Sequence, residues 1–182
     1  MAIGPADAIL VSTRGPLAGA GTWTHQNSSP ANTLCSDEQL VRGPLEMLWF
    51  RDTDFLLANR HGRAPTALVQ DGRTFVQGLN GLRTQSLYNG RVLWEFDAPS
   101  ILASYNREHS IGAAWTGGNI CLGPDRVFLH NGKVCFVLDA STGQKLAQWK
   151  PPALPNGKSS VWGYMAYKDG ILFGSLARED YL

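Results

Sequence analysis

From residue 66 onward, short apolar runs alternate with turn signals along the chain. Asp71-Gly72, a dipeptide that favours a two-residue hairpin turn, follows the first run. Further turn signals at residues 78–81 and 88–90 separate the next runs. The pattern therefore predicts one antiparallel meander of four strands, over residues 67–70, 73–77, 82–87 and 91–96.

The same order of strands and turns recurs further along the chain. A shift of 53 residues places Phe75 on Phe128 and Gly90 on Gly143 without a gap. We interpret this as an internal repeat. It predicts a second set of four strands, over residues 119–122, 126–130, 133–139 and 145–149, and a third unit that begins with runs at 162–168 and 171–175.

The predicted strand at residues 133–139 is apolar on both of its faces. Val134, Phe136 and Leu138 alternate with the equally apolar Cys135 and Val137. A strand with one solvated face would alternate apolar and polar residues, so both faces of this strand are expected to be covered. Four-stranded sheets that stack around a common axis, as the blades of a β-propeller do, cover both faces in this way. The predicted fold class is therefore all-β, with antiparallel four-stranded blades.

The turn after this strand and the tryptophans of the fourth strands are expected to have structural roles. Asp139 is placed to accept N–H bonds from the following Ser-Thr-Gly turn, and Gly143 to supply the positive φ at its exit. Trp94 and Trp149 come at the ends of the fourth strands, where a large ring can dock on the next blade. Burying one such ring contributes on the order of 3 kcal/mol of transfer free energy.

Residues 1–65 are expected to form a lead-in segment of irregular loops with one strand, at residues 45–50. Residues 6–13 fit either a short helix or a strand. Ser36 and Gln39 have the spacing of a capping box, which predicts a helical turn. The rest of the chain divides into a first blade at 66–98, a loop at 99–118, a second blade at 119–150, a loop at 151–161 and the first half of a third blade at 162–182.

The composition suits a folded β protein and excludes two classes of partner. Of the 182 residues, 43% are hydrophobic and 17% charged, which is typical of a globular chain. The net charge is +1 with both signs interspersed, so no basic stripe marks a nucleic-acid surface. No apolar run approaches the roughly 18 residues of a membrane span. The first residues do not resemble a secretory signal, so no targeting segment indicates the compartment.

Three cysteines, Cys35, Cys121 and Cys135, are present without a C-x-x-C pair. This pattern favours neither a disulfide framework nor a structural zinc site. We expect all three to be buried free thiols that pack as small hydrophobic side chains.

Two stretches, LDASTGQKLAQW at 138–149 and LYNGRVLW at 87–94, resemble the repeat of pyrroloquinoline-quinone (PQQ)-type β-propellers. That repeat has an Asp, then Thr-Gly, then a Trp a few residues on. The opening segment, with Trp23, a Pro-Ala-Asn-Thr run and a later Leu-Trp strand, also resembles this family. In the first repeat Ser86 replaces the Asp and Asn89 the Thr, and Gln85 stands where Leu138 stands in the second. The matching positions are Gly90, Trp94, Asp139, Thr142, Gly143 and Trp149.

The resemblance implies a partial propeller of about two and a half blades, in a family that includes PQQ- and calcium-dependent dehydrogenases, an outer-membrane assembly lipoprotein and larger bacterial proteins. The family's dehydrogenases carry a vicinal Cys-Cys pair and an Asp base; this sequence has no such pair and no carboxylate that matches the base. Because a propeller closes with about four to eight blades, the expected partners are the remaining blades of a longer chain, and possible binding proteins. An exported, periplasmic or secreted location is implied by the resemblance alone.

Candidate ligand-binding residues are Arg60, His61 and Arg63, in a loop before the first blade. They could bind an anionic group such as a quinone carboxylate or a phosphate. The alternative is a solvated basic turn that anchors the loop. His25 and Asn27 could contact a metal or substrate, but internal hydrogen bonding of the opening loop is the favoured interpretation.

Other chemistry-bearing residues are expected to be structural. His109 and His130 have no second ligand at a suitable spacing, so no metal site is predicted. Trp115 could stack on a quinone, but packing between blades is the favoured role. No catalytic residue is assigned.

Two functions follow from these features. The first is a non-catalytic propeller segment that acts as a binding or scaffolding module in a larger bacterial protein. The alternative is part of a PQQ-dependent alcohol or sugar dehydrogenase, with the catalytic residues in other blades. A third possibility is that the propeller regulates a fused enzyme domain.

Overall fold

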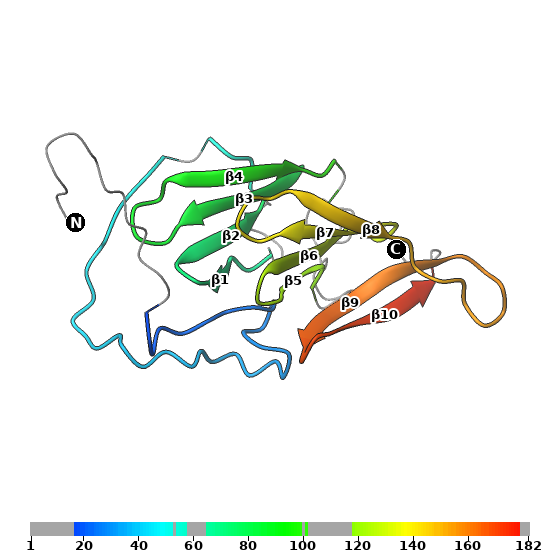
Figure 1. Cartoon of the computed structure of the whole chain (residues 1–182), viewed down its shortest axis with the longest axis horizontal. Coiled ribbons are helices and arrows are strands. Elements are labelled where there is room, and N and C mark those ends of the chain that lie inside the picture. Colours follow the sequence, from blue (N-terminus) through cyan, green and yellow to red (C-terminus); the bar gives the residue numbers. More distant parts are fainter. Residues whose placement is uncertain (1–16, 53, 58–64, 100, 102–117, 179–182) are drawn as a thin grey trace, which may run out of the picture.

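The computed structural model describes residues 17–52, 54–57, 65–99, 101 and 118–178. Within these ranges the chain contains strands and no α-helix, so no helix there could cross a membrane. Two four-stranded antiparallel sheets, ordered β1-β2-β3-β4 and β5-β6-β7-β8, are followed by the two-stranded pair β9-β10 (Figure 1). The strands are β1 Leu68–Gln70, β2 Arg73–Gln77, β3 Gly81–Ser86, β4 Val92–Asp97, β5 Ile120–Leu122, β6 Arg126–His130, β7 Cys135–Asp139, β8 Lys145–Trp149, β9 Ser160–Lys168 and β10 Ile171–Arg178.

Every strand predicted after residue 66 is present, and β2, β6 and β8 have the predicted bounds. Strand β7 begins two residues later than expected. The side-chain oxygen of Asn131 accepts the backbone N–H groups of Lys133 (3.1 Å) and Val134 (2.9 Å), so the turn retains these donors. Strand β10 extends to Arg178, which pairs with Ser160 at the start of β9. Trp94 lies inside β4 and not at its end.

Two predictions for the lead-in segment are wrong, and residues 6–13 lie outside the described residues. Residues 45–50 are not part of any sheet and are mostly exposed. Residues 36–39 are not helical. The carboxylates of Asp37 and Glu38 instead accept the backbone N–H groups of Thr22 (2.8 Å) and Gly21 (2.6 Å). These hydrogen bonds join residues 21–22 to residues 37–38. The segment is therefore held by a contact with another part of the loop and does not form a helical turn.

The β5–β8 sheet lies between the β1–β4 sheet and the β9–β10 pair, and it is covered on both faces (Figure 1). Its side chains alternate between two core clusters, as the apolar pattern of residues 133–139 predicts. Ile120, Leu122, Val127, Leu129 and Leu138 join the cluster shared with β1–β4. Cys121, Phe128, Cys135 and Val137 join the cluster that contains Met165 of β9.

The cysteine prediction is correct for two of the three residues. Cys121 and Cys135 are buried free thiols, and the Cys135 sulfur lies 3.8 Å from the Met165 sulfur. Burial raises the pKa of both thiols, that of Cys135 to about 12. Cys35 is exposed, because it lies in the opening loop, outside both core clusters.

The lead-in segment runs beside β1 and β5 (Figure 1) and contacts the end of β9 through the side chain of His25. Trp23 and Val69 of β1 exchange two backbone hydrogen bonds of 2.8 Å, and the Leu122 N–H of β5 donates to the Thr24 carbonyl (2.9 Å). The Tyr167 N–H of β9 donates to Nε2 of His25 (3.0 Å). Three consecutive residues therefore contact all three sheets.

Candidate functional site

The turn between β7 and β8 is held by one carboxylate. Oδ1 of Asp139 accepts the backbone N–H groups of Ser141 (2.9 Å) and Thr142 (2.8 Å), and both of their hydroxyls. The hydroxyl bonds of Ser141 and Thr142, with the backbone bonds, lower the pKa of Asp139 to about 2. Gly143 follows with φ of +74°. A carboxylate that accepts four local hydrogen bonds has a structural role in this turn.

The matching turn between β3 and β4 keeps two of the side-chain bonds of this turn, from different side chains. The Ser86 hydroxyl accepts the Tyr88 N–H (3.3 Å), as Asp139 accepts that of Ser141. The Asn89 side chain accepts the N–H two residues on (3.1 Å), as the Thr142 hydroxyl does (3.3 Å). The Ser and Asn that depart from the family pattern therefore keep the turn.

A tryptophan docks on each of these turns. The Trp94 Nε1 of β4 donates to the Ala140 carbonyl (3.1 Å), and its ring covers Gly143, where an added Cβ would meet a ring carbon at 2.6 Å. Trp49 has the same relation to the first sheet: its Nε1 donates to the Leu87 carbonyl (2.7 Å) and its ring covers Gly90 at 2.6 Å. Both acceptors and both glycines are separated by the 53-residue offset of the sequence.

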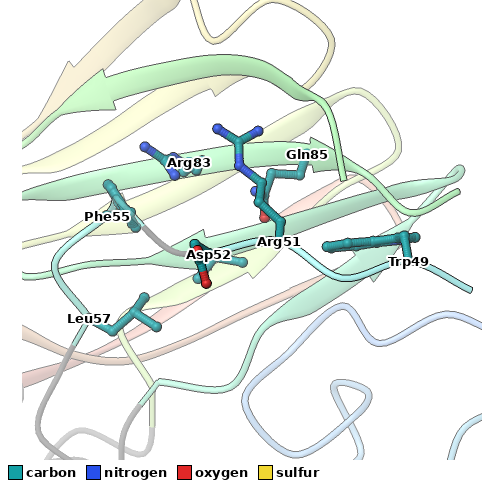
Figure 2. Close-up of a pocket in the computed structure, with 8 residues that line it drawn as sticks. Trp49, Arg51, Asp52, Phe55, Leu57, Arg83 and Gln85 are labelled. Atoms are coloured by element: carbon teal, nitrogen blue, oxygen red, sulfur yellow. The ribbon is translucent and has the colours of Figure 1, made fainter. Parts of the chain in front are cut away.

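Beside Trp49, the lead-in segment and the β1–β4 sheet enclose a pocket of about 230 Å³ (Figure 2). Side chains of the segment and of β3 face one another across it. It is lined by Trp49, Arg51, Asp52, Phe55, Leu57, Val76, Arg83 and Gln85. This pocket is the candidate functional site, because it combines an aromatic ring with several charged groups.

Arg83 organises the charges of the pocket. Its residue is 7% exposed. Its guanidinium pairs with Asp54 and, at 2.5 Å, with Glu95, and it lies 4.6 Å from the centre of the Phe55 ring. The hydrogen bond from Arg83 holds the pKa of Asp54 below its usual range. Arg51 also reaches Asp54 (3.8 Å). Because these arginines already have carboxylate partners, the described side chains of the pocket carry no excess positive charge to attract an anion.

The polar character of this face is particular to the first sheet. The 53-residue offset places Arg83 on Phe136 and Gln85 on Leu138, which are apolar and pack toward β1–β4. The sequence signal for the pocket is therefore a pair of polar residues, Arg83 and Gln85, at apolar repeat positions. The sequence interpretation identified Gln85 and missed Arg83. Asp54 and Phe55 had no such signal, since they lie in an irregular segment.

The described histidines are buried and structural. His25 is 1% exposed; because its Nε2 accepts from Tyr167, its proton is on Nδ1, which donates to the Thr24 hydroxyl (2.8 Å). Burial lowers the pKa of His25 to about 4. Nδ1 of His130 accepts the Gly132 N–H (3.0 Å), and burial lowers the pKa of His130 to about 4. Asn27 bonds within its loop, to Asn32 (3.4 Å).

Several predicted site residues lie outside the described residues: Arg60, His61, Arg63, His109 and Trp115. Among the residues that are described, no group of three or more His, Cys, Asp or Glu side chains could hold a metal ion. The described part of the chain therefore offers no cluster of such side chains for calcium.

Comparison with solved structures identifies the fold of the chain. No family model matches the sequence, and neither does any curated protein. Among solved structures, a quinohemoprotein alcohol dehydrogenase from Pseudomonas putida HK5 is 18% identical, with a TM-score of 0.55 over 86% of this chain and 23% of its own. A europium-containing methanol dehydrogenase is 17% identical, with a TM-score of 0.58 over 87% of this chain and 28% of its own. The chain thus has the fold of part of a quinoprotein-type β-propeller and spans about a quarter of these two proteins' length.

Proposed function

We propose that this chain is a non-catalytic segment of a PQQ-like propeller, and that it acts as a binding or scaffolding module in a larger bacterial protein. Its blades are residues 66–98 and 119–150, with half a blade at 162–182. The observation that carries the proposal is the use of the charged groups: Asp139 holds a turn, and Arg83 pairs with Asp54 and Glu95. Charged groups that bond to one another in this way support structure and are less available for acid–base chemistry.

The alternative is a fragment of a PQQ-dependent alcohol or sugar dehydrogenase whose catalytic residues lie in other blades. The likeness in fold to two dehydrogenases favours it. Identities of 17–18% limit that likeness to the fold, because one fold carries many functions. Under this alternative, Arg60, His61 and Arg63 would be candidates for binding the quinone carboxylates.

The experiment uses the native protein expressed from its complete reading frame. It is incubated with PQQ and calcium, passed over a desalting column, and assayed for quinone absorbance and for dye-linked oxidation of alcohols and sugars. A known quinoprotein dehydrogenase, stripped of PQQ and reloaded, is the control. The proposal expects no retained quinone and no dye reduction. Retained quinone with substrate-dependent dye reduction would establish the dehydrogenase instead.

A further inference from the structure

Three hydrogen-bond donors that line the pocket beside Trp49 are engaged with the turn between β3 and β4. Nε1 of Trp49 donates to the Leu87 carbonyl (2.7 Å), and the side-chain amide of Gln85 donates to the Gly90 carbonyl (3.4 Å). Arg51 donates to the same Gly90 carbonyl (3.3 Å). These bonds leave the side-chain oxygen of Gln85 as an acceptor that faces the pocket with Arg51 and Trp49.

The charges of the pocket leave one carboxylate without a partner. Arg83 pairs with Asp54 and Glu95, and Arg51 reaches Asp54 as well. Asp52 also lines the pocket, but it makes no hydrogen bond or ion pair within the part of the chain that the structure describes. Two arginines thus face three carboxylates, so the described side chains of the pocket and their partners carry a net negative charge.

Apolar side chains flank the unpaired carboxylate. In Figure 2, Asp52 lies between Trp49 at one end of the pocket and Phe55 and Leu57 at the other. Val76 of β2 adds to the apolar lining. The volume of about 230 Å³ corresponds to roughly eight water-sized groups of about 30 Å³ each, which is space for one ring with a short chain.

We propose that this pocket binds a small organic cation, a primary amine carried on one aromatic or aliphatic ring. The inference rests on the proposed role as a binding module and names its ligand class. The ammonium group donates to the Asp52 carboxylate, with the Gln85 oxygen as a second acceptor, and the ring packs on the apolar lining. The indole of Trp49 adds attraction, since an aromatic ring favours a nearby positive charge.

Two other ligand classes fit these groups less well. An anion would meet arginines that already have carboxylate partners, next to the unpaired Asp52. A bare metal ion would find too few oxygen ligands beside the apolar lining, and the described residues hold no group of three or more His, Cys, Asp or Glu side chains suited to a metal.

The repeat itself does not require this pocket. At the matching positions of β7, Phe136 and Leu138 replace Arg83 and Gln85, and both pack in the core shared with β1–β4. Polar residues at these two positions therefore serve something other than the packing of one sheet on the next.

Calorimetric titration of the native protein, expressed from its complete reading frame, tests the proposal with three probes of similar size. Phenethylammonium is positively charged, phenethyl alcohol is neutral and hydrocinnamate is negatively charged. We expect the ammonium ion to bind at one site about tenfold or more tightly than the alcohol, because a charged hydrogen bond is made only by the ion. Hydrocinnamate is expected to give no saturable heat. Absence of saturable binding by the ammonium ion, or binding no tighter than that of either other probe, would overturn the proposal.

Two variants with the same change in charge locate the site. Asp52→Asn keeps the shape of an exposed side chain and is expected to weaken binding of phenethylammonium about tenfold. Asp169→Asn removes the same charge from the exposed turn between β9 and β10, and it is expected to leave the affinity unchanged. Equal affinities of the two variants would show that the ion does not bind at Asp52.

The titrations contain no quinone, so the two proposals fail separately. Retained quinone with dye reduction would refute the non-catalytic role and would leave binding of the amine at Asp52 standing. Equal binding of the charged and neutral probes would refute the amine site and would leave the non-catalytic role standing.

Discussion

The docking of Trp94 on Gly143 leads to a prediction that a single added methyl group can test. Gly143 has φ of +74°, and an added Cβ would lie 2.6 Å from a ring carbon of Trp94. Gly143→Ala therefore has two costs. The left-handed backbone costs an alanine about 1 kcal/mol, and overlap with the packed indole costs a further 1–3 kcal/mol or so. We expect a loss of about 2–4 kcal/mol in the free energy of unfolding.

The chain offers a matched control. Gly157 has a nearly identical φ of +77°, but an added Cβ would meet no atom within 4 Å. Gly157→Ala is expected to cost only the conformational part, about 1 kcal/mol. The difference between the two variants isolates the contact with Trp94. Equilibrium urea unfolding followed by far-ultraviolet circular dichroism measures both, without relying on tryptophan fluorescence.

A double-mutant cycle completes the argument. In a Trp94→Leu background the ring is absent, so Gly143→Ala should cost about as much as Gly157→Ala, and the coupling should be about 1–3 kcal/mol. If Gly143→Ala and Gly157→Ala cost the same in the wild-type background, Trp94 does not dock on this turn and the interface is assembled differently.

Two further predictions concern acid and thiol reagents. His25 and His130 have a folded pKa of about 4 against 6.5 when unfolded, so the unfolded chain binds more protons between these values. Stability should be complete above about pH 6.5 and fall by about 2–3 kcal/mol per histidine as the pH approaches 4, measured as the urea midpoint. A midpoint that stays constant over this range would contradict the burial of both rings. Toward a thiol reagent, Cys35 should react in the folded protein, whereas Cys121 and Cys135 should react only at the rate of unfolding, since both are fully buried. Immediate reaction of all three would contradict the two core clusters.

The sequence predicted the sheets well because their signals are local. Asp71-Gly72 and Asn131-Gly132 carry turn chemistry within a few residues, and apolar residues on both faces of 133–139 require two covering neighbours. The wrong prediction at Ser36–Gln39 shows the limit of such signals. Its acidic residues bond to backbone groups 15 and 17 residues upstream, and a local spacing rule does not contain that partner.

The candidate site was less predictable, since its partners come from segments without periodicity. Gln85 is recognisable in the sequence as a polar residue at an apolar repeat position. The ion pair between Asp54 and Arg83 has no local sequence signal, because it depends on how the irregular segment folds onto β3. At residues 45–50 the opposite holds: the sequence signal is clear, but the structure contains no strand there. Its pattern is that of a strand, yet a strand needs a neighbour to donate and accept backbone hydrogen bonds, and the described chain provides none.

The ion pairs of Arg83 with Asp54 and Glu95 help to position the lead-in segment, although they add little to stability. The Asp54 and Glu95 side chains are 66% and 47% exposed, so their Coulomb energy is screened and contributes little net stability. The Arg83 side chain, at 8% exposure, carries the desolvation cost, and removing Asp54 and Glu95 would leave that cost without compensation. Directional bonds from one buried guanidinium therefore act mainly to fix where Asp54 lies against β3. Because Arg51 also contacts Asp54 and is two residues from Trp49, this contact helps to hold the indole over Gly90.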